Sequence, residues 1–271
     1  MYQFKKERIS ESIYRIDGVG NVCMYFVLGK QRGLLVDTGY GLGDLRGFIE
    51  ANFFVPYDVI VTHGHVDHAN GMGQWDQVYM SHLDLDIYHK HSSLEYRQSF
   101  LLRSGEIVDD LSDFVIAKDT VIKDLKDGKE FDLGGVHVLA ISTAGHTKGI
   151  VSLLIQEERI LMLGDSCGEF TFMFNPESSS IAVYKDTLKK IKSYSSYYDR
   201  IIRQHGNYES NLDIVDNNLE IFEEILQGVD DHIEWQFMGK KIWIAKEMDQ
   251  KSHARKDGKS GNIVYSLDKL R

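Results

Sequence analysis

Residues 59–71 read VIVTHGHVDHANG and place three histidines and an aspartate directly after a run of β-branched apolar residues. The chain of 271 residues has only 11 histidines, so three of them within six positions demand an explanation. If Val61 and Thr62 end a buried strand, the polar side chains lie on the loop leaving it or on the first turn of the next helix. Imidazoles and a carboxylate at this density indicate a cation site, and the H-x-H-x-D-H spacing suits two adjacent metal ions.

Three positions further along the chain supply what this motif lacks. His146 lies in TAGHTKG, Asp165 in LMLGDSCG and His205 in IIRQHGN. Each follows a predicted strand and stands beside a glycine. A lone histidine or aspartate after a strand is usually a capping or hydrogen-bonding residue. Three of them at strand ends favour metal ligands, because loops on a rigid scaffold carry binding residues.

The pattern around these positions predicts a layered α/β architecture. The expected strands are 12–16, 22–29, 33–39, 57–62, 77–81, 129–143, 150–156, 159–165, 199–206, 240–247 and 262–267. The expected helices are 43–53, 180–194 and 210–228, the last capped by Ser210 or Asn211 and ended by Gly228. This order fits two sheets inside and helices outside.

Length and composition favour one domain over residues 1–271, since 42% of the residues are hydrophobic. Residues 82–116 form a polar, mainly helical insertion, which is a candidate cover for the site. Its histidines, His82, His89 and His91, are expected at the surface.

Charge and cysteine content exclude several classes of protein. The net charge of −10 argues against nucleic-acid binding, and the basic stretch KSHARKDGK (251–259) is interpreted as a solvated turn. No apolar run reaches the length of a membrane span, and the N-terminus lacks the apolar region of a signal peptide. Cys23 and Cys167 imply no disulfide framework and fit a reducing cytoplasm, with Cys167 as a buried inert thiol.

The order H-x-H-x-D-H, G-H-T, G-D and H resembles the metallo-β-lactamase-fold superfamily, and LLVDTG (34–39) resembles its first motif. The resemblance covers residues 12–206. It implies a four-layer αββα sandwich of two mixed β-sheets flanked by helices. The subgroup stays open: lactonases of the family usually carry tyrosine where this chain has Gly168, and glyoxalase II-like thioesterases have a mainly helical C-terminal region where strands are expected here.

The resemblance also implies a division of labour among the site residues. The ligands of the first metal would be His63, His65 and His146. The ligands of the second would be Asp67, His68 and His205, with Asp165 bridging both. Asp37 would orient the ligand loop through hydrogen bonds. The implied cofactors are two divalent metal ions, zinc first, with iron or manganese as alternatives.

The expected function is a dinuclear metal-dependent hydrolase of a small ester, thioester or lactone. A water shared by two such ions loses a proton near neutral pH, and the bridging hydroxide attacks a carbonyl carbon. Asp67 would orient this hydroxide and pass its proton to the leaving group. The aromatic residues of FTFMF (170–174) line either an apolar pocket or the core, and Tyr208 is a candidate substrate contact. The expected partner is a small-molecule substrate, and the oligomeric state is not readable.

Two other functions stay open. The first is an iron-dependent oxidoreductase resembling persulfide dioxygenases, which share several of these ligands. The second is a non-catalytic binding protein on a retired scaffold, which the presence of all seven ligands disfavours. Metal analysis and an oxygen-uptake assay would separate the alternatives.

Overall fold

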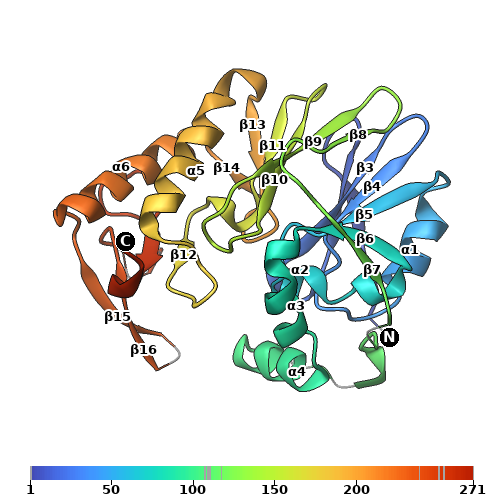
Figure 1. Ribbon diagram of the computed structural model, residues 1–271, viewed down its shortest axis with the longest axis horizontal. Coiled ribbons are helices and arrows are strands. Elements are labelled where there is room, and N and C mark those ends of the chain that lie inside the picture. Colours follow the sequence, from blue (N-terminus) through green and yellow to red (C-terminus); the bar gives the residue numbers. More distant parts are fainter. Residues whose placement is uncertain are drawn as a thin grey trace.

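The computed structural model describes residues 2–106, 108, 111–116, 118–237, 239–249, 251–252 and 254–270. Two mixed β-sheets pack face to face at its centre, and helices cover their outer faces (Figure 1). The predicted αββα sandwich is therefore confirmed. The helices are α1 (Leu45–Asn52), α2 (Val66–Ala69), α3 (Leu85–His91), α4 (Leu94–Arg103), α5 (Ile181–Ser193) and α6 (Ile214–Gln227).

The first sheet follows the chain from the N-terminus without changing strand order. Its strands are β1 (Lys6–Arg8), β2 (Ile13–Asp17), β3 (Cys23–Leu28), β4 (Gly33–Val36), β5 (Tyr57–Ile60), β6 (Gln77–Met80) and β7 (Val121–Asp124). Strand β3 is apolar throughout because both of its faces are buried. Cys23, Tyr25 and Val27 pack toward the second sheet, whereas Met24 and Phe26 pack toward α1.

The second sheet has the order β14-β13-β11-β10-β9-β8. Its strands are β8 (Glu130–Asp132), β9 (His137–Ser142), β10 (Val151–Ile155), β11 (Ile160–Met162), β13 (Arg200–Ile202) and β14 (Glu209–Ser210). The single strand predicted over 129–143 is wrong, because Gly134 and Gly135 have φ values of 83° and 87° and turn the chain into a hairpin. Helices α5 and α6 cover the outer face.

The sequence predicted the residues that cap both ends of α6, and only the C-terminal one is confirmed. Gly228 ends the helix in the left-handed conformation, with φ 69°, as predicted. The predicted caps, Ser210 and Asn211, are wrong: Asp213 occupies that position, without a side-chain hydrogen bond to the helix. Ser210 is held instead in β14, which pairs with β13, so the helix begins later.

A third, four-stranded sheet lies beside α6 and was not predicted. Its strands are β12 (Thr171–Met173), β17 (Ile263–Tyr265), β16 (Lys240–Ile244) and β15 (Ile233–Phe237), in that order. The expected late strands are β16 and β17, and β15 was missed because its side chains are mostly exposed. The parallel pairing of β12 with β17 fixes the C-terminal segment against residues 170–174.

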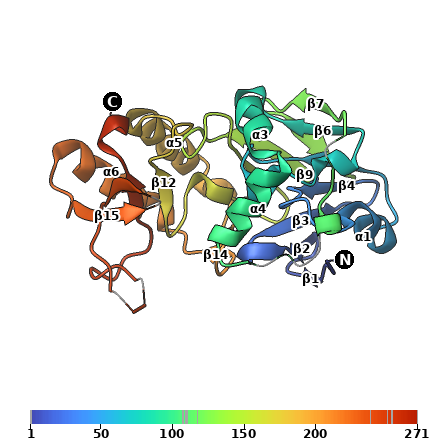
Figure 2. The ribbon, with the colours of Figure 1, turned by 90° about the horizontal axis from the view of Figure 1, so that it is seen from below.

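The described residues of the segment 82–116 contain the helices α3 and α4. These helices and the β15–β16 hairpin project from the same side of the molecule, with β12 between them (Figure 1, Figure 2). The stretch 251–259 forms turns where the structure describes it, and its His253 lies outside the described residues. None of the helices in the described ranges has the length and apolar character needed to cross a membrane.

The third sheet should contribute to global stability. Ile263 is fully buried, so Ile263→Ala should lower the free energy of unfolding by about 2–5 kcal/mol through the cavity it leaves. The control Leu267→Ala, at a side chain that is 46% exposed, should change it by less than about 0.5 kcal/mol. Denaturant unfolding measures both, and an equally small effect of the two variants would contradict a packed third sheet.

Candidate metal centre

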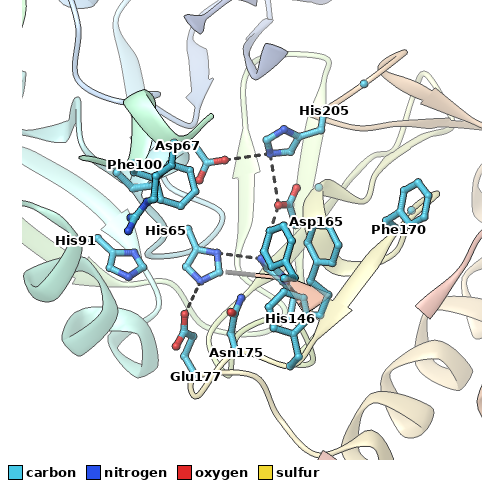
Figure 3. Close-up of a pocket in the computed structure, with 18 of the residues that line it drawn as sticks. His65, Asp67, His91, Phe100, His146, Asp165, Phe170, Asn175, Glu177 and His205 are labelled. Carbon is cyan, nitrogen blue, oxygen red and sulfur yellow. Dashed lines mark hydrogen bonds and ion pairs between the residues drawn. The ribbon is translucent and has the colours of Figure 1, made fainter. Parts of the chain in front are cut away.

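The structure brings together all seven residues predicted as ligands, and each lies at the end of a strand, in the turn after it or in the short helix that follows. Figure 3 shows His65, Asp67, His146, Asp165 and His205 gathered at one place. His63 and His65 follow β5, and Asp67 and His68 lie in the short helix α2. The others follow β9, β11 and β13: they are His146, Asp165 and His205. The strand ends meet at one edge of the two packed sheets, which explains why residues so distant in sequence converge.

The first trio consists of His63, His65 and His146, all buried. Nδ1 of His65 lies 3.2 Å from Nε2 of His63 and 2.9 Å from Nε2 of His146. An ion bound tetrahedrally at about 2.0–2.1 Å from each nitrogen would hold those nitrogens roughly 3.3 Å apart. The trio therefore has the dimensions of one coordination site.

The second trio consists of Asp67, His68 and His205. Nε2 of His205 lies 3.1 Å from Nε2 of His68 and 3.3 Å from Oδ2 of Asp67. Asp165 lies between the trios. Its Oδ2 is 3.7 Å from Nε2 of His146, 3.7 Å from Nε2 of His68 and 3.5 Å from Nε2 of His205. This placement fits the expected bridging carboxylate.

The hydrogen-bond acceptors on the outer side of the first trio favour the tautomers in which the inner nitrogens carry no proton. A neutral imidazole has one N–H. His146 uses its N–H on Nδ1 to donate to the carbonyl oxygen of Phe172, at 3.1 Å. His65 donates from Nε2 to Oε1 of Glu177, at 3.2 Å. Two lone pairs thus face each other across 2.9 Å, an arrangement that a cation would stabilise.

Asp37 orients residues of the other half of the site through hydrogen bonds, as the resemblance implied. Its buried carboxylate accepts hydrogen bonds from Nδ1 of His68 at 2.9 Å and from Nε2 of Gln204 at 3.2 Å. It also accepts from the backbone N–H and the hydroxyl of Thr62, at 2.7 and 3.0 Å. Since the Thr62 hydroxyl donates to Asp37, it can accept from Nδ1 of His63, 3.1 Å away. In that tautomer Nε2 of His63, which faces the other ligands, carries no proton.

The two trios differ in charge. Burial and the neighbouring His65 lower the pKa of His146 to about 4, and burial also lowers the pKa of His63. Against the effect of burial, Asp165 and Asp67 raise the pKa of His205 to about 9, and the nearby carboxylates raise the pKa of His68. Cation binding at the second trio would therefore displace protons, whereas His63 and His146 of the first trio are held neutral.

Two carboxylates that support the site, the buried Asp84 and the half-buried Glu177, were missed from the sequence. Asp84, just before α3, accepts hydrogen bonds from the N–H of Gly64 at 3.0 Å, the N–H of Gly149 at 2.8 Å and the hydroxyl of Thr147 at 2.6 Å. It thereby ties the His63 loop to the His146 loop. Glu177 holds His65, as described above. Neither residue stands in a recognisable motif, so only their tertiary contacts reveal them.

A cavity of about 770 Å³ opens over the site. Its aromatic lining comes from the third sheet and from α4: Phe170, Phe172, Phe174, Phe237, Tyr96 and Phe100. Figure 3 shows Phe100 and Phe170 on opposite sides of the histidine cluster. Both interpretations of residues 170–174 hold, because the phenylalanines line the cavity while Thr171 and Met173 are buried in the core.

Two expectations about residues near the site are wrong. His82 and His89 are exposed as expected, but His91 is 4% exposed and its ring stacks on Tyr96 at 4.3 Å. Its helical spacing from the buried residues 87 and 88 was the signal that it faces inward. Tyr208 is no cavity residue: its hydroxyl lies 3.1 Å from Oδ1 of Asn21, and the guanidinium of Arg15 covers its ring.

A profile of the metallo-beta-lactamase superfamily matches residues 17–196. The chain belongs to this superfamily. The human protein named acyl-coenzyme A thioesterase MBLAC2 is 24% identical over 238 residues, which cover 81% of this chain and 76% of that protein. The metallo-beta-lactamase fold-containing protein ST1585 of Sulfurisphaera tokodaii is 27% identical over 200 residues, or 69% and 73% of the two chains.

Solved structures of the superfamily share the fold. A metallo-beta-lactamase from Pontibacter korlensis superimposes with a TM-score of 0.58 at 17% identity, covering 82% of this chain and 99% of that one. At this identity the likeness concerns the fold alone. The match to the superfamily supports hydrolase chemistry and metal binding at the level of the family, and the substrate has to be argued from the cavity.

Glu177 should strengthen metal binding by holding the N–H of His65 on Nε2. We expect Glu177→Gln to weaken the affinity of the first trio for Zn²⁺ or Co²⁺ by about 10–100-fold, measured by competition with a chelator. Glu157→Gln is a matched control, because Glu157 also pairs with a histidine, His137, but at the exposed end of β9. An unchanged metal affinity in Glu177→Gln would remove Glu177 from the metal centre.

Both cysteines should be unreactive in the folded protein. Burial raises the pKa of Cys167 to about 12 and also raises the pKa of Cys23. Because the thiolate is the reactive form, neither should react with a disulfide reagent at neutral pH, and activity should survive the treatment. Both should react once the chain is unfolded in guanidinium chloride. Rapid modification of the native protein would contradict this prediction.

Proposed function

We propose that this protein is a dinuclear metal-dependent hydrolase of acyl thioesters and related small esters. The observation that carries the proposal is the pair of donor trios, joined by Asp165, at the base of a cavity with aromatic walls. The similarity to the human acyl-coenzyme A thioesterase supports a thioester as substrate. The two free, buried cysteines fit a reducing compartment, and we place the reaction in the cytoplasm.

The ligands in this proposal are those that the family resemblance implied. The first trio would hold one cation and the second trio another, and the Asp165 carboxylate lies where it could serve both. Two divalent cations held there would supply a water of lowered pKa and a Lewis acid for the carbonyl oxygen. Asp37, Asp84 and Glu177 orient the ligands through the hydrogen bonds described above, so that the histidines need no rearrangement on binding.

The protein's own part in the chemistry falls to Asp67 and to the cavity walls. Asp67 lines the cavity, so its carboxylate can hold a proton beside the scissile bond and deliver it to the departing sulfur or oxygen atom. The phenylalanines of the third sheet bind the acyl chain and exclude water. Helix α4 forms the opposite wall, and we propose that the 82–116 insertion covers bound substrate.

Three exposed basic residues around the cavity favour an anionic substrate, although the chain carries a net charge of −10 and the lining also includes Asp67, Asp165, Glu169 and Glu177. Lys90, Arg103 and Lys240 all line the cavity, and all three are exposed. They lie on α3, α4 and β16, around the aromatic walls. Such a rim attracts a phosphate-bearing leaving group while the acyl chain enters the apolar interior.

Hydrolysis should depend on both trios and on Asp67. Protein loaded with zinc, iron or manganese is assayed for thiol release from acyl thioesters, with metal content and oxygen uptake measured in parallel. We expect a chelator to abolish turnover and Asp67→Asn to lower kcat by about 10²–10⁴-fold. His146→Ala and His205→Ala should each lose metal, whereas the exposed His82→Ala should behave as the wild type.

The outcomes separate this proposal from the two alternatives. Oxygen uptake with an iron-loaded protein and no thiol release would favour the oxidoreductase. Unchanged metal content in a protein that carries both His146→Ala and His205→Ala would contradict the metal centre itself. Metal binding without turnover on ester, thioester, lactone, phosphodiester and β-lactam substrates would favour a binding protein.

A further inference from the structure

Arg203 is a buried cation in the wall of the cavity. It follows β13 directly, two residues before His205, and only 7% of it is exposed. It lines the same cavity as Asp67 and Asp165. None of the described carboxylates forms an ion pair with its guanidinium, whose bonds are all to neutral groups.

The guanidinium has more donors than the protein satisfies. Nη2 donates to Oδ1 of Asn207 at 3.0 Å and to the carbonyl oxygen of Glu209 at 3.4 Å. Nε is buried and has no hydrogen-bond partner among the described residues. A guanidinium carries five N–H groups, and a buried, unpaired charge destabilises a folded protein unless an anion joins it. The cavity is where such an anion can enter.

Two other arginines in the described chain are buried, and neither lines the cavity, although Arg97 also has a buried Nε without a hydrogen-bond partner among the described residues. Arg255 forms an ion pair with Asp257. Arg97 donates to two backbone carbonyls and lies over the ring of Phe114, at 5.0 Å from its centroid. Burial without a charged partner, at the wall of the substrate cavity, is thus particular to Arg203 among the buried arginines.

Gly168 makes room for this guanidinium. A Cβ atom at position 168 would lie 2.7 Å from Nη1 of Arg203. The φ angle of Gly168 is outside the left-handed region, so its backbone does not require glycine. The absence of a side chain at Gly168 therefore leaves the space that the Arg203 guanidinium occupies beside the cavity.

We propose that Arg203 binds an anionic oxygen group of the substrate, either a carboxylate or a phosphate. This inference rests on the proposed function and deepens it, since it names a chemical group that the substrate carries. A guanidinium binds both groups through paired, charge-assisted hydrogen bonds, which apolar surroundings strengthen. A substrate that lacks the group leaves buried donors unpaired and is rejected.

Three thioesters with the same thiol scaffold test the proposal and distinguish the two anions. Hexanoyl pantetheine is neutral, hexanedioyl pantetheine adds a carboxylate at the far end of the acyl chain, and hexanoyl phosphopantetheine adds a phosphate on the thiol side. For metal-loaded wild-type protein, we expect kcat/KM for one of the anionic thioesters to exceed that for the neutral one by about 10–100-fold. The preferred thioester identifies whether Arg203 binds an anion on the acyl side or on the thiol side of the substrate.

Variants assign this preference to Arg203. In Arg203→Met the ratio of kcat/KM for the preferred anionic thioester to kcat/KM for hexanoyl pantetheine should fall to about one. Gly168→Ala keeps the charge of Arg203 but displaces its Nη1, so it should also lower this ratio of kcat/KM values. If Arg203→Met does not fold, Gly168→Ala tests the role of Arg203 in its place. The control Arg159→Met removes an exposed arginine that pairs with Asp199, and it should keep the wild-type ratio.

Calorimetric binding of hexanedioate and phosphopantetheine separates this inference from the proposed function. If no thioester is hydrolysed but one of these anions binds wild-type protein at least about tenfold more tightly than both variants, the subsite stands and the proposed function fails. If thioesters are hydrolysed without preference for an anion, or the preference survives in both variants, Arg203 has no such role, whereas thioester hydrolysis at the metal centre stands. If the two anions bind equally to wild-type protein, Arg203→Met and Gly168→Ala, and no thioester is hydrolysed, both the subsite and the proposed function are contradicted.

Discussion

A neutral histidine has a single N–H, and in this protein the surroundings hold that proton on the outer side of the metal centre. Phe172, Glu177 and Asp37 supply the outward acceptors for His146, His65 and His68. The inner nitrogens of the first trio then face one another at 2.9 and 3.2 Å, an arrangement that a bound cation would stabilise. Each acceptor belongs to a different part of the chain, so the site is complete only when those parts have packed together.

The architecture explains how these parts meet. Asp37 follows β4, Asp84 precedes α3 and Glu177 follows β12. The two packed sheets deliver β4, β5, β9, β11 and β13 to one edge, and the hydrogen bonds of the three carboxylates join the loops across that edge. Buried acceptors of this kind stabilise the loops and orient the ligands at the same time. Stability and function therefore share the same contacts here.

The cavity combines two kinds of recognition that the superfamily fold does not dictate. Its aromatic walls come from the third sheet and from the 82–116 insertion, which lie outside the two packed sheets. Its charges come from exposed residues at the rim and from the buried Arg203. Apolar area supplies affinity with little discrimination between similar chains, whereas an unpaired buried donor discriminates strongly between substrates. Under the proposed function, specificity would therefore come both from walls added outside the two packed sheets and from Arg203, which directly follows β13 in the shared scaffold.

The sequence by itself determined the two-sheet architecture and the seven candidate ligands, because both depend on local patterns: strand periodicity, and histidine or aspartate beside glycine at strand ends. Only the tertiary structure decided which groups surround the ligands. Glu177 lies 112 positions from His65, and Asp84 lies 63 positions from Thr147, with no spacing rule to join them. The burial of His91 and Arg203 and the third sheet likewise arise from packing between distant segments, which one-dimensional periodicity does not encode.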